Sequence, residues 1–232
     1  MTITLAVALA LTPITLDGER LEEGRHCYVL EAGGQPMGHV RETIAAAPSI
    51  AGPAWSIRVE QLLPARGVEF VDHFLVTRDT LRPVAFHSVL NGEEIARLLY
   101  LEDQVVGRKK ERESGEIVRV DEAHGGVIEG NLWGATLSAM TLEAGGSYRP
   151  TYYQYREGVG AFAIDVTGED RIDFEGEEVD VWLVAMGFSE ARQTTYLIGK
   201  EDGRDYGTRG QGFAQTRLPD CSALDALSSS SE

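Results

Sequence analysis

The chain has 232 residues, 43% of them hydrophobic, and 21 lysine and arginine residues against 37 aspartate and glutamate residues give it a formal net charge of -16. This hydrophobic content supports a packed core and excludes general disorder, and the length suits one large β domain. A surface with this much negative charge repels phosphate backbones and anionic lipid head groups. We therefore expect neither nucleic-acid binding nor electrostatic docking on a membrane.

Residues 1–16 have competing interpretations. Residues 5–11 are apolar and Ala8-Leu9-Ala10 resembles a signal cleavage site, but no lysine or arginine precedes them. The segment is a signal peptide that lacks the usual basic start, an unusual signal peptide, or a first β-strand. We prefer the signal, because Thr12-Pro13 and Asp17-Gly18 interrupt the run. A periplasmic or exported location is then expected, with a cytoplasmic one as the alternative. The run is too short to cross a bilayer as a helix, so no transmembrane segment is predicted.

Strands separated by turns are predicted for the first half of the chain. In residues 54–63, Ile57 and Val59 share one face while Arg58 and Glu60 take the other. Asn91-Gly92 between two alternating runs is a strong hairpin signal, because both residues tolerate a positive φ. The predicted strands cover residues 27–31, 37–44, 54–63, 68–77, 83–90, 96–101, 104–112 and 116–121.

The middle of the chain has a different pattern. Leu132, Trp133, Leu137 and Met140 follow helical spacing and predict a short amphipathic helix near residues 130–143, although Gly130 and Gly134 disfavour it. Strands resume at 147–157, 159–170, 178–188, 191–200 and 210–218, with a hairpin-type turn at Gly176. We therefore predict a mainly β fold, an antiparallel meander in a single domain spanning 17–218, followed by a mobile tail at 219–232.

Several segments together resemble the bacterial family catalogued as domain of unknown function 3108. They are the turn and strand Asp79 to Val84, the pair Leu142 and Gly145, the block from Val166-x-Gly168-x-Asp170 through Gly176 to Val184, and Thr195 to Ile198. The resemblance covers roughly residues 25–218. It implies an exported bacterial protein whose long antiparallel sheet is curved into a half-barrel or open barrel, similar to the lipoprotein carriers. The family has no accepted catalytic residues, so none is carried over, and the missing basic signal start leaves export open.

Cys27 and Cys221 are the two cysteines, one near each end of the chain. They form either a single bridge that ties the ends together or two isolated thiols. No CxxC motif or Cys/His metal spacing is present, so no metal and no cofactor are expected.

Two histidines have a spacing that could bring them together. Asp72 and His73 fall on opposite faces of one predicted strand, whereas pairing about a turn centred near residue 80 places His73 opposite His87. Such a pair could hold a metal or act with a carboxylate or a tyrosine in acid–base catalysis. Without a third ligand or a nucleophile in the pattern, histidines with purely structural roles are the preferred interpretation.

Aromatic and basic side chains gather at Tyr152, Tyr153, Tyr155 and Arg156, where they could form a platform for a sugar ring or a lipid head group. The alternative is a strand pair with half-buried tyrosines.

The function predicted from these patterns is non-catalytic: a carrier that holds an apolar or amphipathic, lipid-like molecule on the concave face of the curved sheet. The residues predicted to line this site are Tyr152, Tyr153, Tyr155, Arg156, Trp133, Trp182, His73 and His87. One alternative is an envelope scaffold or interaction module with a filled core and a partner protein. Another is a hydrolase or lyase that uses His73 and His87. Catalytic residues stay unassigned.

Overall fold

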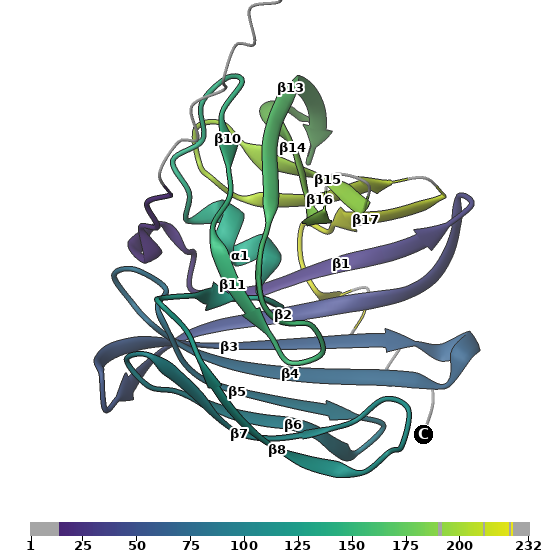
Figure 1. Ribbon diagram of the computed structural model, residues 1–232. Helices are drawn as coiled ribbons and strands as arrows, with labels where there is room; N and C mark the ends of the chain where they lie inside the picture. Colours follow the sequence, from purple (N-terminus) through teal and green to yellow (C-terminus); the bar gives the residue numbers. More distant parts are fainter. Residues whose placement is uncertain (1–13, 190–191, 211, 223, 225–232) are drawn as a thin grey trace, which may run out of the picture.

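The computed structural model describes residues 14–189, 192–210, 212–222 and 224, and these residues form one open sheet of fourteen strands and a small sheet of three (Figure 1). All neighbours in the large sheet are antiparallel, which confirms the predicted mainly β, antiparallel fold. The chain runs from β1 to one edge of the sheet at β8. It returns at the other edge with β10, and its last strand β17 pairs with β1.

The strands of the large sheet in spatial order are β10 (Ser147–Tyr148), β13 (Ala163–Phe174), β14 (Glu177–Ser189), β15 (Arg192–Gly199), β16 (Asp205–Gly210), β17 (Phe213–Arg217), β1 (Gly24–Ala32), β2 (Gln35–Ser49), β3 (Gly52–Leu63), β4 (Val68–Thr77), β5 (Pro83–Leu90), β6 (Glu93–Tyr100), β7 (Gln104–Lys110) and β8 (Ile117–Ala123). The small sheet contains β12 (Gly158–Ala161), β11 (Thr151–Gln154) and β9 (Ile128–Glu129). Two short 3-10 turns, η1 (Gly18–Arg20) and η2 (Pro64–Arg66), complete the elements besides the helix described below.

The predicted hairpins form at their expected turns. Asn91 and Gly92 have φ values of 50° and 79°, the left-handed pair that a two-residue hairpin requires. Glu175 and Gly176 adopt the same conformation, with φ values of 58° and 82°.

The predicted helix is shorter than expected. Only Trp133–Ser138 is helical (α1), and residues before it pair as β9 with β11. A Cβ atom on Gly130 would lie 2.5 Å from the carbonyl oxygen of Tyr153, so this glycine allows a close approach between β9 and β11. The residues just before α1 therefore pair with β11 as a strand, and the helix begins only at Trp133.

Two of the predicted strands are each divided between the two sheets. Residues 147–157 break at Arg149-Pro150 into β10 and β11, because proline has no N–H to donate to the ladder. Residues 159–170 break at Phe162, so that β12 pairs with β11 while β13 enters the large sheet.

The large sheet curves around α1 and β11, which cover its inner face (Figure 1). One core cluster joins Trp55, Phe74 and Phe86 of the sheet to Tyr153 and Tyr155. A second cluster joins strands β13–β15 to the part of the chain from residue 128 to 162, called the middle segment below. Its members are Ile164, Val184, Met186 and Ile198 from the sheet and Leu137, Met140, Tyr152 and Phe162 from the middle segment. The inner face is therefore largely filled by the chain's own aromatic side chains.

The two ends of the described chain are each joined to distant parts of the fold. Cys27 and Cys221 form a disulfide, which resolves the choice between a bridge and free thiols. Leu16 forms an isolated bridge with Met140. Residues 1–13 of the predicted signal and residues 223 and 225–232 of the predicted tail lie outside the described residues.

We expect Gly130→Ala to lower the free energy of unfolding by about 1–3 kcal/mol, because the added methyl group meets backbone that cannot move independently. Gly125→Ala is the matched control, since a Cβ there meets nothing within 4 Å. Urea denaturation of both variants measures the difference, and equal stability would contradict the close approach of β9 and β11.

Candidate functional site

A row of basic side chains crosses the outer face of the sheet, the face opposite α1 and β11. His73 lies opposite His87 as predicted, with ring centroids 6.2 Å apart. Each residue of this basic row stands directly opposite the next in the strand register, one from each of six consecutive strands. From β3 to β8 they are Arg58, His73, His87, Arg97, Arg108 and Arg119.

A single carboxylate holds the centre of the basic row. Glu94 accepts hydrogen bonds from Nε of Arg97 at 2.8 Å and from Nε of Arg108 at 2.6 Å, and it lies 3.0 Å from Nε2 of His87. The two guanidinium groups lower the pKa of Glu94 to about 2, so this carboxylate stays ionised. It is therefore a poor general base near neutral pH.

His73 differs from Glu94 in its response to pH. Burial lowers the pKa of His73, and the positive charge of Arg58 lowers it further. Nε of Arg58 donates to Nε2 of His73 at 3.2 Å, which requires that nitrogen to be unprotonated. His73 is therefore neutral near pH 7.

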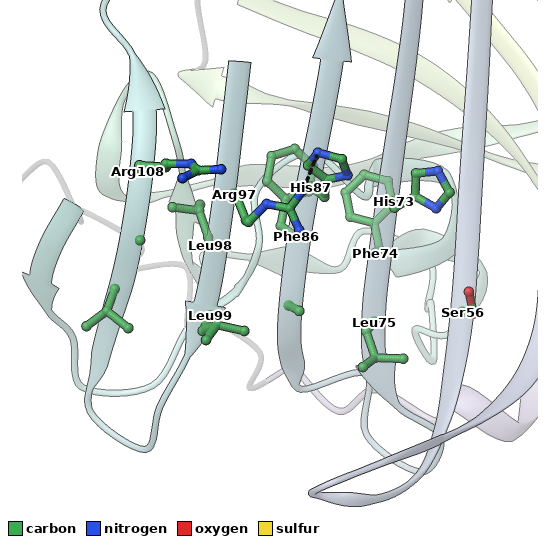
Figure 2. Close-up of a pocket in the computed structure, with 13 residues that line it drawn as sticks. Ser56, His73, Phe74, Leu75, Phe86, His87, Arg97, Leu98, Leu99 and Arg108 are labelled. Atoms are coloured by element: carbon green, nitrogen blue, oxygen red, sulfur yellow. Dashed lines mark hydrogen bonds between the residues drawn. The ribbon is translucent and has the colours of Figure 1, made fainter. Parts of the chain in front are cut away.

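An apolar row runs beside the basic row on the same face. It crosses β4 to β7, with one residue from each strand. In the strand register Leu75 lies opposite Ala85, Ala85 opposite Leu99, and Leu99 opposite Val106. Figure 2 shows His73, His87, Arg97 and Arg108 in one line across neighbouring strands, with Leu75 and Leu99 in the adjacent line.

The two rows bound a pocket of about 580 Å³. Its lining contains four basic residues and no acidic one, with Ser56 and Gly107 at its sides. Leu99, in the apolar row, is 53% exposed to solvent. The sheet thus presents an apolar surface with positive charge along one side.

The aromatic residues predicted to bind a ligand lie in the core. Tyr152, Tyr153 and Tyr155 are at most 6% exposed, and the ring of Tyr152 stacks on Phe162 with 4.2 Å between centroids. Arg156 lies over the ring of Tyr155, 5.1 Å from its centroid.

The predicted tryptophans also pack within the protein. Trp133 makes edge contacts with Phe162 and Phe188, with centroids 5.3 and 5.0 Å apart. Trp182 lies under the ammonium group of Lys200, 4.3 Å from the ring centroid. The structure therefore gathers Trp133, Trp182 and Tyr152 on the inner face and the His73–His87 pair on the outer face, so the predicted residues do not share one site.

Buried polar groups join the middle segment to the inner face of the sheet. Glu129, 2% exposed, accepts hydrogen bonds from the Tyr100 hydroxyl and from the backbone and side-chain nitrogens of Asn131. Burial raises the pKa of Glu129 to about 7. Asp72 accepts a hydrogen bond from Ser88, and burial raises the pKa of Asp72 to about 6. Asp72 thus faces away from His73 and His87 and cannot act with them.

A second polar cluster lies between β1, β2, β16 and α1. Glu42 and Asp205 line two small cavities there, of about 210 and 290 Å³. Burial raises the pKa of each carboxyl to about 7, and their proximity to one another contributes in the case of Glu42. Asp205 accepts a hydrogen bond from the backbone of Gly207 at 2.8 Å. In the described part of the chain, no group of three histidine, cysteine, aspartate or glutamate residues is placed to hold a metal ion.

The arginines of the basic row, the leucines beside them and Glu94 were not predicted as site residues from the sequence. Strand register is the nearest signal, but extending the pairing from His87 through the Asn91-Gly92 hairpin leads to Ala96, and the bulge that places Arg97 opposite His87 has no signal in the sequence. No helix in the described residues is long and apolar enough to cross a membrane.

The fold and this site define a mainly β protein with a large open, curved sheet and an amphipathic pocket on the outer face of that sheet. The chain belongs to the family described as "Protein of unknown function (DUF3108)", whose sequence profile matches residues 27–211. None of the curated proteins and none of the solved structures matches the chain.

Proposed function

We propose that this protein is a non-catalytic binding protein for an amphipathic molecule that has an apolar body and an anionic group, and that the outer-face pocket holds this molecule. The observation that carries the proposal is the pairing of an apolar row with a basic row along a pocket of about 580 Å³. Ligand pockets typically have volumes of about 300–1,000 Å³, mostly apolar walls and a few polar groups that orient the ligand.

The charges of the pocket favour an anion over a cation. Arg97 and Arg108 are each 56% exposed at the side chain and reach the pocket, while Glu94 uses its oxygens on these same arginines. An exposed guanidinium keeps donors for a carboxylate, sulfonate or phosphate group. On a chain of net charge -16, a local basic row is a specific feature rather than part of a basic surface.

A pair of fluorescent probes tests the proposal. Anilinonaphthalene sulfonate and N-phenylnaphthylamine share an apolar skeleton, but only the first carries an anionic group. We expect the sulfonate to bind more tightly, and we expect Leu99→Asp to weaken it about tenfold or more because a carboxylate then faces both the skeleton and the sulfonate.

The matched control is Ile50→Asp, which places the same charge on a fully exposed apolar residue outside the pocket. Equal weakening by Leu99→Asp and Ile50→Asp would contradict binding in this pocket. Equal affinity for the two probes would contradict recognition of the anionic group.

The filled inner face supports a second candidate, the interaction module. Tyr153 and Phe162 are fully buried against the inner face of the large sheet, so the protein's own side chains fill the interior without a ligand. In-cell crosslinking from the outer face would recover a defined partner protein if this candidate is correct. The Cys27–Cys221 disulfide supports an exported location for either function, since such bonds persist in oxidising compartments.

A further inference from the structure

Strand β8 ends the large sheet with its outer edge unpaired in the described residues (Figure 1). Opposite residues in an antiparallel pair alternate between hydrogen-bonded and non-hydrogen-bonded positions. Glu111 donates to Glu116 at 2.8 Å, and His124 donates to Asp103 at 2.7 Å, which fixes the even-numbered residues of β8 as those bonded to β7. The backbone groups of Ile117, Arg119, Asp121 and Ala123 therefore point to the open edge.

This edge has few of the features that prevent strand addition. It contains no proline, its register with β7 is unbroken over all seven residues, and Ile117 is 57% exposed. At the opposite edge of the sheet β10 pairs with two residues of β13, and the edge of β13 is interrupted by a bulge between Val166 and Gly168. Long, regular edges of this kind are templates for another strand.

We propose that β8 pairs antiparallel with β8 of a second copy of this chain, with Val120 at the two-fold axis, and so joins the two sheets. This inference goes beyond the proposed function and does not depend on it. The pairing is isologous, because the same strand contributes to both sides.

The charges on the edge select this register. Arg119 and Asp121 point their backbone groups outward and their side chains to the outer face. Centring the pair on Arg119 would place arginine opposite arginine, and centring it on Asp121 would place aspartate opposite aspartate. Only centring on Val120 places each Arg119 opposite Asp121 of the second copy, which gives two opposite-charge pairs.

The remaining contacts also suit this register. Ile117 then lies opposite Ala123 of the second copy, which covers its exposed side chain. Within one chain, Arg119 and Asp121 already contact each other at 3.0 Å with side chains 79% and 45% exposed, so both are accessible to a partner.

Sedimentation velocity over a range of concentrations tests the proposal. The unmodified chain is expected to show a reversible monomer–dimer equilibrium. Arg119→Asp places aspartate opposite aspartate twice, and we expect the dimer dissociation constant to rise about tenfold or more. Asp121→Arg is expected to act in the same direction, and the double variant Arg119→Asp/Asp121→Arg is expected to restore the original constant.

The control is Arg66→Asp, which makes the same change in net charge at an exposed residue of η2. Circular dichroism melting of each variant separates loss of pairing from loss of fold. A chain that is monomeric up to roughly millimolar concentration overturns the proposal. So does a dimer that is unaffected by Arg119→Asp, or equally weakened by Arg66→Asp. Failure of the charge-swapped double variant to dimerise overturns the register.

Discussion

Reduction of the Cys27–Cys221 disulfide is expected to lower the free energy of unfolding by about 4–5 kcal/mol. The bond closes a loop with a sequence separation of 194 residues, and cross-linking so long a loop removes much of the conformational entropy of the unfolded chain. It also fixes the segment after β17 to β1, where Leu218 donates to the carbonyl of Cys27 at 2.7 Å. Urea denaturation with and without a reductant measures the effect.

The design of this experiment is simple because the chain has two cysteines and both are in the bond. The reductant should therefore have no effect on the variant Cys27→Ala/Cys221→Ala, which reports the same loss by another route. A reduced protein as stable as the oxidised one would show that the unfolded chain gains little freedom from opening the loop.

The second large effect is an unusual dependence of stability on pH. Burial raises the pKa of Glu42, Glu129 and Asp205 to about 7 and that of Asp72 to about 6. As pH rises from about 4, the unfolded chain releases these protons first, so the folded state loses stability until its own carboxyls ionise near pH 7. The stability that these raised pKa values give the folded state is fully present below the pKa values of the unfolded chain and is lost as pH rises through about 7.

We expect the free energy of unfolding to be highest near pH 4–5 and to fall by several kcal/mol toward pH 8. Below that range, protonation of carboxyls whose pKa is lowered, such as Glu94, removes stability again. Glu129→Gln keeps the shape of the side chain without its charge and should reduce the fall by about 3 kcal/mol. Glu177→Gln, at an exposed position in β14, is the control. A fall that is unchanged by Glu129→Gln would show that this carboxyl does not bind its proton more tightly in the folded state.

The fold was largely predictable because its strands are local patterns. Alternation over residues 54–63 and the Asn91-Gly92 turn depend on near neighbours, and both are present as predicted. The middle segment was less predictable because its conformation depends on distant contacts. Residues near Gly130 pair with β11, and Phe162 separates two strands that enter different sheets.

The candidate site shows the same division. The sequence alone determined the antiparallel strands, their turns and the opposition of His73 and His87, since a hairpin's register follows from its turn. Only the tertiary structure decided that Arg97 joins this pair. A bulge between Ser88 and Val89 shifts the register of β5 and β6 by one residue, and without it His87 would face Ala96. Because side chains alternate between faces, that one-residue shift decides whether the arginine reaches the outer pocket or the core.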